Sequence, residues 1–125
     1  MSETRVVHVN DQVHDAIYIG RANPRKRLAA SPFANPFRIT ERSDLGPGIS
    51  RHMACQMYYN YLRSSISGRP LLARLPELRG HALACWCRKD GEARRASNEC
   101  HGDQIIRLLD RYTDDELRAM ANESL

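Results

Sequence analysis

The 125-residue chain is long enough for one domain with a substantial core and too short for two. A formal net charge of +4 admits phosphate-bearing partners without demanding them, and 42% hydrophobic residues exclude disorder throughout. The chain has no apolar run of about 18 residues and no leader pattern, so with its four cysteines it is expected to be cytoplasmic, without a membrane partner or disulfide framework.

The N-terminal part is predicted to hold two strands and a long loop. β-Branched residues predict a strand over Arg5–Val9, followed by a turn at Asn10–Asp11. A second strand over Ala16–Gly20 ends at glycine. Residues 21–38 contain three prolines, which exclude a long helix or a central strand. We therefore expect a loop over the edge of the sheet, and loops of that length are usually functional or disordered.

The longest predicted helix spans Arg51–Ile66, with Ser50 as its N-cap. Its apolar face is expected to contain Met53, Met57 and Tyr61, which recur every four residues, joined by their neighbours Ala54, Tyr58, Leu62 and Ser65. Cys55 falls beside this face and is interpreted as a packing residue.

Shorter elements follow in the second half. Leu71–Leu78 predicts a short helix broken by Pro76, and the apolar run Ala82–Cys87 predicts a buried strand. A wide apolar face predicts a helix over residues 103–112, with Asp103 as its N-cap. The polar residues 88–99 between them show no periodicity.

The chain ends in a predicted short helix and has the order of an α/β protein. Thr113–Glu116 is a capping box for a helix from Asp114 to about Ala121. Strands that alternate with helices predict a small α/β domain with a mostly parallel sheet of three or four strands, flanked by helices. We expect a single domain over residues 1–125, with a core from about 5 to 112 and the C-terminal helix within 113–122.

Thiols gather where the predicted buried strand ends and the next helix begins. Cys85 and Cys87 are two apart on the strand and project from one face, while Cys100 and His101 precede the helix. Three thiols and an imidazole are donors that tetrahedral zinc prefers, so these four residues are the predicted metal ligands. Their spacing is not that of a zinc finger, and buried packing of the cysteines is an equal alternative. A redox dithiol is less favoured, because its cysteines are normally separated by two residues.

The start of this helix also has the features of an anion site. Free N–H groups and the positive end of the helix dipole favour a phosphate, a carboxylate or a thiolate at Cys100. A turn at Gly102 would let both Cys100 and His101 point inward and let a ligand approach the backbone. The simpler alternative is an ordinary helix cap formed by Asp103.

The loop over residues 21–38 is basic. Guanidinium groups and exposed aromatic rings suit phosphates and bases, respectively, so the loop is a candidate binding surface. The alternative is a solvated loop that its aromatic residues anchor to the core. The residues concerned are Arg21, Arg25, Lys26, Arg27, Phe33, Phe37 and Arg38.

A series of short motifs resembles the bacterial and phage family catalogued as domain of unknown function 4326. In chain order these motifs are Tyr18–Arg21, Asn35–Phe37, Tyr61–Leu62, Leu78–Gly80, Leu83–Cys87 and Cys100–Asp103. The chain departs from the family pattern at Ala34, where glycine is usual, and in a longer spacer over residues 88–99. The resemblance implies one shared site at the sheet edge, built from Arg21, Asn35, Cys87, Cys100, His101 and Asp103.

The leading hypothesis is an intracellular enzyme or enzyme-like domain that acts on a nucleotide or another phosphate-bearing substrate. Its predicted catalytic residues are Cys100, His101 and Asp103. Its predicted substrate-binding residues are Arg21, Asn35, Arg38 and Gly102. The second hypothesis is a zinc-stabilised nucleic-acid-binding module without catalysis, and the third is an interaction domain whose cysteines only pack. The sequence does not specify the reaction, the substrate or the oligomeric state.

Overall fold

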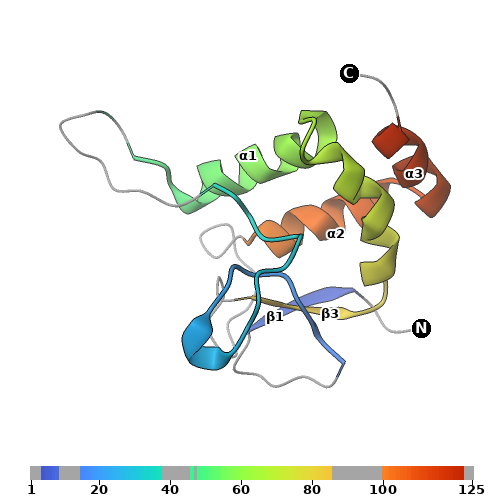
Figure 1. The fold of residues 1–125 in the computed structure, drawn as a ribbon. Coiled ribbons are helices and arrows are strands. Elements are labelled where there is room, and N and C mark those ends of the chain that lie inside the picture. The colour runs from blue at the N-terminus through green and yellow to red at the C-terminus, as the bar shows by residue number, and fades with distance from the viewer. Residues whose placement is uncertain (1–3, 9–14, 38–45, 47, 86–99, 123–125) are drawn as a thin grey trace.

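Three short parallel strands form the sheet of the computed structural model, in the order β1-β3-β2 (Figure 1). They are β1 (Arg5–His8), β2 (Ile17–Tyr18) and β3 (Ala82–Cys85). The predicted parallel α/β sheet is thereby confirmed, with three strands. The structure describes residues 4–8, 15–37, 46, 48–85 and 100–122, so the predicted turn at 10–11, the end of the third strand at 86–87 and the spacer 88–99 lie outside it.

The strand register fixes which side chains share a face at the carboxyl edge of the sheet. Val6 pairs with Leu83, and His8 pairs with Cys85, so these four side chains form two rows on one face. All four residues of the central strand β3 are buried, as expected for a strand with a neighbour on each side. The backbone N–H of Gly80 donates to Thr4 Oγ1 at 2.6 Å, which fixes the opposite edge.

Helix α1 (Arg51–Ser64) begins as predicted and buries one side of its predicted apolar face. The Met53 N–H donates to Ser50 Oγ at 3.2 Å, which confirms the N-cap. The place predicted for Met53 on this face is wrong, because its side chain is 47% exposed. Ala54, Tyr58 and Leu62 of the predicted face are buried, and Cys55 and Tyr59 are buried beside them.

The segment after α1 forms one continuous 3₁₀-helix, η3 (Arg69–Leu78), rather than a helix broken at Pro76. Leu72, Leu75 and Leu78 are buried, and their spacing of three matches a helix with three residues per turn. Pro76 lies within η3 and its carbonyl accepts from the Arg79 N–H at 3.2 Å. A break was expected because proline interrupts an α-helix, but this segment adopts the tighter 3₁₀-helix.

Two α-helices complete the chain, α2 (His101–Arg111) and α3 (Asp114–Asn122). The predicted capping box of α3 is confirmed, since the N–H of Thr113 donates to Glu116 Oε1 and the N–H of Glu116 donates to Thr113 Oγ1. Figure 1 shows α1, α2 and α3 on one side of the sheet, and α2 contacts both β1 and α1. None of the described helices is long and apolar enough to cross a membrane.

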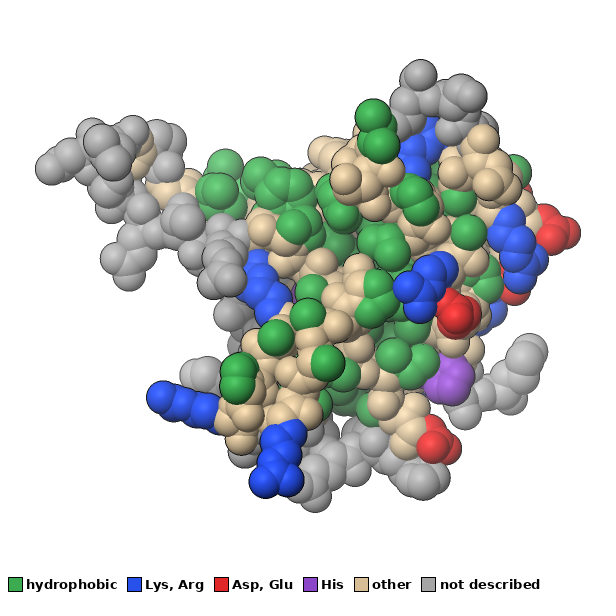
Figure 2. All heavy atoms as spheres, viewed as in Figure 1, with side chains coloured by type: hydrophobic (Ala, Val, Ile, Leu, Met, Phe, Trp, Pro, Cys, Tyr) green, Lys and Arg blue, Asp and Glu red, His purple; other side chains and the backbone are tan. Residues whose placement is uncertain are grey.

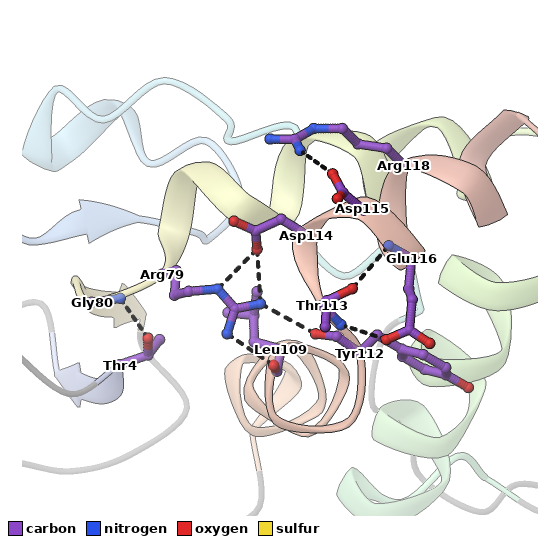
Figure 3. A network of polar contacts seen from close by, with 10 residues as sticks. All are labelled: Thr4, Arg79, Gly80, Leu109, Tyr112, Thr113, Asp114, Asp115, Glu116 and Arg118. Atoms are coloured by element: carbon purple, nitrogen blue, oxygen red, sulfur yellow. Dashed lines mark hydrogen bonds and ion pairs between the residues drawn. The ribbon is translucent and has the colours of Figure 1, made fainter.

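Arg79 joins the end of α2 to the start of α3 (Figure 3). Its guanidinium donates to the carbonyl oxygens of Leu109 and Tyr112 at 3.0 and 3.3 Å, and it forms an ion pair with Asp114 at 2.9 Å. Cationic groups at a helix C-terminus satisfy free carbonyls and complement the dipole. The next residue, Gly80, has φ +84°, a conformation that side chains rarely adopt. The Leu78–Gly80 motif is thus a structural connector.

The described part of the basic loop, residues 21–37, holds one short 3₁₀-helix, η2 (Pro24–Lys26), and no strand longer than an isolated bridge. Arg25 and Arg27 are exposed, and Figure 2 shows basic side chains at the lower left, over the η2 region of Figure 1. Phe33 is 4% exposed and Phe37 is half-buried, so the aromatic residues anchor the loop, as the alternative interpretation expected.

Candidate thiol–imidazole site

A buried cluster of two thiols and an imidazole lies at the carboxyl edge of the sheet. The Sγ atoms of Cys85, at the end of β3, and Cys100, just before α2, are 2.9 Å apart. Both cysteines are 0% exposed and His101 is 5% exposed. The sequence predicted that these three residues converge, and the structure brings them together. Cys87, the fourth predicted ligand, lies outside the described residues.

The hydrogen bonds of His101 determine which of its nitrogens carries a proton. Nε2 lies 2.7 Å from the carbonyl oxygen of Ile19, which can only accept, so Nε2 donates. In the neutral imidazole Nδ1 is therefore the acceptor, and it lies 3.7 Å from Cys100 Sγ. The lone pair that accepts the thiol proton thus faces the sulfur. This is the arrangement of a nucleophile with an oriented base.

Tyr58 of α1 closes the cluster from the helix side. Its ring packs edge-on against His101 with 5.3 Å between centroids, and its hydroxyl donates to the carbonyl of Phe33 at 2.7 Å. Burial raises the pKa of the Tyr58 phenol strongly, and negative charge on Cys100 and Tyr61 raises it further. Tyr58 therefore remains a neutral hydrogen-bond donor beside the thiol.

The start of α2 is capped by Cys100, and the prediction that Asp103 is the N-cap is wrong. The Gly102 N–H points to Cys100 Sγ at 3.4 Å. Asp103 occupies the third helical position, where its Oδ2 accepts from the Cys100 N–H at 3.0 Å. The extended conformation of Cys100 directs the chain inward, so no turn at Gly102 is needed. The catalytic role predicted for Asp103 stays a prediction beside this structural one.

Gly102 is required for packing rather than for a turn. Its φ is not positive, and a Cβ at this position would lie 2.8 Å from Val6 Cγ2 and 2.9 Å from Ile19 Cδ1. The expectation of a turn at Gly102 is therefore wrong, and substrate binding by Gly102 stays a prediction. The glycine lets the first turn of α2 rest directly on the sheet.

The predicted anion-binding residues of the loop make bonds that fold the loop. An Arg21 Nη atom donates to the carbonyl of Phe37 at 2.9 Å, across the loop. Asn35 is 9% exposed, and its amide donates to the Ala54 carbonyl and accepts from the Phe37 N–H. Arg38 lies outside the described residues. Substrate binding by these three residues stays a prediction.

His8 is a candidate site residue that sequence reasoning missed. It ends β1 in register with Cys85, so its side chain lies on the same face of the sheet, one strand away. In the sequence it is an isolated histidine. Its place near the carboxyl end of the predicted strand Arg5–Val9 was the signal in the sequence, whereas its register with Cys85 is known only from the structure.

The cluster has some of the geometry of a metal site, although no group of three or more His, Cys, Asp or Glu residues among the described ones is arranged to hold a metal ion. In tetrahedral zinc sites the bond lengths place two sulfurs about 3.8 Å apart, and sulfur and nitrogen about 3.6 Å apart. The separation of Cys100 Sγ and His101 Nδ1 is 3.7 Å, whereas that of the two sulfurs is only 2.9 Å. Zinc would fit if the thiols moved apart.

Two surface cavities lined by described residues lie elsewhere. The larger, about 650 Å³, lies beside Arg79 and Asp114 at the junction of α2 and α3. The smaller, about 400 Å³, lies beside Phe37 and Tyr61. Neither is lined by Cys85, Cys100 or His101, so a ligand of the cluster would have to enter by another route.

The chain belongs to the family described as Domain of unknown function (DUF4326), whose model matches residues 4–111. An uncharacterized protein of Acanthamoeba polyphaga mimivirus is 30% identical over 109 residues, which cover 82% of this chain and 76% of the viral protein. No solved structure matches the chain. The expected family is confirmed, and the expected bacterial or phage source stays a prediction.

Most of the motif residues that carried the resemblance have a structural role. Asn35 and Arg79 hold loops and helix ends, and Gly80 and Gly102 meet backbone or packing constraints. A folding role is less obvious for a thiol that caps a helix, because serine, threonine, aspartate and asparagine are the preferred N-caps. The Cys100–His101 pair is therefore the part of the motif set that points to chemistry.

Proposed function

We propose that the protein is an enzyme or enzyme-like domain that acts on a nucleotide or another phosphate-bearing substrate, with Cys100 as nucleophile and His101 as base. The observation that carries the proposal is the orientation of His101, whose Nδ1 faces Cys100 Sγ at 3.7 Å while Nε2 is held by Ile19. A base fixed by a third group is the usual arrangement for activating a thiol.

The chemistry of the pair follows from its atoms. His101 Nδ1 takes the proton of Cys100, and the thiolate attacks an electrophilic centre of the substrate. The leaving group departs with the proton that His101 returns, and water then cleaves the bond to sulfur. The thiolate would be stabilised by the N–H of Gly102, whose nitrogen is 3.4 Å away, and by the S–H of Cys85, whose Sγ is 2.9 Å away.

A phosphate-bearing substrate suits the charge and topology of this region. The site lies at the carboxyl edge of a parallel sheet, where ligands of open α/β sheets bind, and at a helix N-terminus, which favours anions. Exposed Arg25 and Arg27 add positive charge on the loop that follows β2. Because Cys100 is fully buried, the site must open for the substrate to reach it.

To test the proposal, the protein is incubated with nucleoside mono-, di- and triphosphates. Products are followed by ³¹P NMR, and covalent adducts are located by peptide mass mapping. Cys100→Ser should keep the fold, because serine is a better N-cap than cysteine, yet lose turnover by about 100-fold or more. His101→Gln removes the base but keeps a donor for Ile19. Cys55→Ser is the matched control, because Cys55 is also buried but lies on α1. Turnover that survives Cys100→Ser would refute the proposal.

A zinc-stabilised nucleic-acid-binding module is the second candidate. It is favoured by the separation of Cys100 Sγ and His101 Nδ1, which matches that of two zinc ligands, and by the exposed Arg25 and Arg27. Cys85, Cys100 and His101 would bind zinc, with Cys87 as the fourth ligand. Zinc would then hold the end of β3 to the start of α2 and supply folding free energy. Binding to nucleic acid should weaken steeply as salt rises, unlike binding to a small nucleotide pocket.

A further inference from the structure

Two arginines lie over one buried tyrosine ring where α1 meets α2. The Cζ atom of Arg107, on α2, is 4.4 Å from the centroid of the Tyr59 ring, and that of Arg63, in the last turn of α1, is 5.5 Å away. Tyr59 itself is only 7% exposed. Each cation is attracted to the ring, but the two like charges held there repel each other.

Neither guanidinium is paired with a carboxylate among the described residues. Arg74 provides the contrast, because it stacks on Phe33 at 5.6 Å and also forms an ion pair with Glu77 at 3.3 Å. Arg63 Nε is moreover the one buried side-chain nitrogen or oxygen in the described part of the chain that has no hydrogen-bond partner. Only this Nε is buried, since the Arg63 side chain is half-buried and Arg107 is exposed, and a ligand oxygen would supply the acceptor that the buried N–H lacks.

Arg107 is held in place by a buried partner. Its Nη1 donates to Gln104 Oε1 at 2.9 Å, and Gln104, one turn earlier on α2, is 1% exposed. Because the buried amide already restricts the Arg107 side chain, less conformational entropy is lost when a ligand binds. The remaining N–H groups of the guanidinium stay as donors for a ligand.

We propose that Arg63 and Arg107 form a binding site for a dianionic phosphate group. Guanidinium groups bind phosphate oxygens through paired hydrogen bonds, and a dianion neutralises both cations at once. The phosphate belongs either to a small molecule or to a nucleic-acid backbone. This site does not depend on the function proposed above, because none of its residues belongs to the thiol–imidazole cluster.

Titration with inorganic diphosphate tests the site, with the Nε–Hε signals of arginine followed by NMR and the affinity measured by calorimetry. The Arg63 and Arg107 signals should shift saturably in the intact protein. Arg63→Gln and Arg107→Gln should each weaken binding about tenfold or more, the usual effect of losing a charge-assisted hydrogen bond. Arg74→Gln is the matched control and should leave the affinity unchanged, because Arg74 already has Glu77 as its partner.

A parallel titration with a single-stranded oligonucleotide identifies the source of the phosphate. Oligonucleotide binding that the same two variants weaken, with a steep salt dependence, assigns the site to nucleic acid. Diphosphate binding alone assigns it to a small molecule. The proposal is overturned if neither probe shifts the Arg63 and Arg107 signals up to about 10 mM, a range that already includes weak affinities. It is also overturned if Arg74→Gln weakens binding as much as they do.

Discussion

A Cβ at Gly102 would lie 2.8 Å from Val6 Cγ2, so the first turn of α2 is in direct contact with β1. The Cys100–His101 pair immediately precedes this contact. The position of the thiol and the imidazole therefore depends on how closely helix and strand approach.

Gly102→Ala is expected to destabilise the protein by about 1–2 kcal/mol. The added methyl group overpacks the contact with Val6 and Ile19, and the better helix propensity of alanine offsets only part of that cost. Urea unfolding of the variant measures the change. Gly102→Ala should cost less stability when it is added to Val6→Ala than when it is made in the parent protein, because the smaller side chain at position 6 relieves part of the overpacking. An alanine variant as stable as the parent would contradict the packing role.

Asp103→Asn should lower stability by about 1 kcal/mol, and Asp103→Ala by about 2 kcal/mol. Asparagine still accepts from the Cys100 N–H but without the charge that favours a helix N-terminus, whereas alanine leaves that N–H without its partner. Thermal unfolding of both variants shows which of them loses more stability. If Asp103→Asn instead abolished turnover at unchanged stability, Asp103 would have the acid–base role predicted from the sequence.

Tyr58 makes the stability of the fold sensitive to alkaline pH. Burial holds the pKa of its phenol far above the ordinary value of 10.0, so the folded protein keeps a proton that the unfolded chain releases. The contribution is fully present below pH 10 and is lost as pH rises above it, by about 1.4 kcal/mol per pH unit.

Absorbance at 295 nm during an alkaline titration should show that the ionisation of Tyr58 coincides with unfolding, which is followed by circular dichroism. Tyr58→Phe should reduce the pH dependence, although it also loses the hydrogen bond to Phe33. Ionisation of Tyr58 in the folded state, seen as absorbance that Tyr58→Phe removes, would argue against the buried phenol.

Metal analysis separates the two candidate functions. The zinc-stabilised module predicts one zinc per chain in protein purified without a metal column, and a marked fall in melting temperature when a chelator removes it. Cys85→Ser should then lose both metal and stability. The thiol enzyme predicts a melting temperature that chelators do not change and thiols that titrate after unfolding. Cys55→Ser is the control, since Cys55 lies on α1 away from the cluster.

The strands and helices were predictable because their signals are local. The β-branched run at Arg5 and the N-cap at Ser50 depend on neighbouring residues only, and both predictions are confirmed. The buried face of α1 was predictable only in part. Tyr58 and Leu62 were expected on it and are buried, whereas Met53 was expected there and is exposed. Contacts from η3 and α2 decide which side of the apolar face is covered.

The site was predictable in part, for a topological reason. A parallel sheet places strand ends and helix starts at one edge, which is why Cys85, Cys100 and His101 were expected to meet. The acceptor of His101 was not predictable, because Ile19 is 82 residues away and presents a backbone atom that every residue has. The pairing of His8 with Cys85 depends on strand register, which the local sequence does not specify.

The two ends of η3 hold α3 in place. Arg69, at the first position of η3, donates to the Met120 carbonyl at 3.2 and 2.7 Å, and Arg79, just after η3, forms an ion pair with Asp114. The family match stops at residue 111, before α3 begins, yet Leu117 of α3 is 0% exposed in the core. A fragment cut to the family boundary would leave two guanidinium groups without these acceptors and uncover the leucines of η3. The smallest fragment expected to fold on its own therefore retains α3.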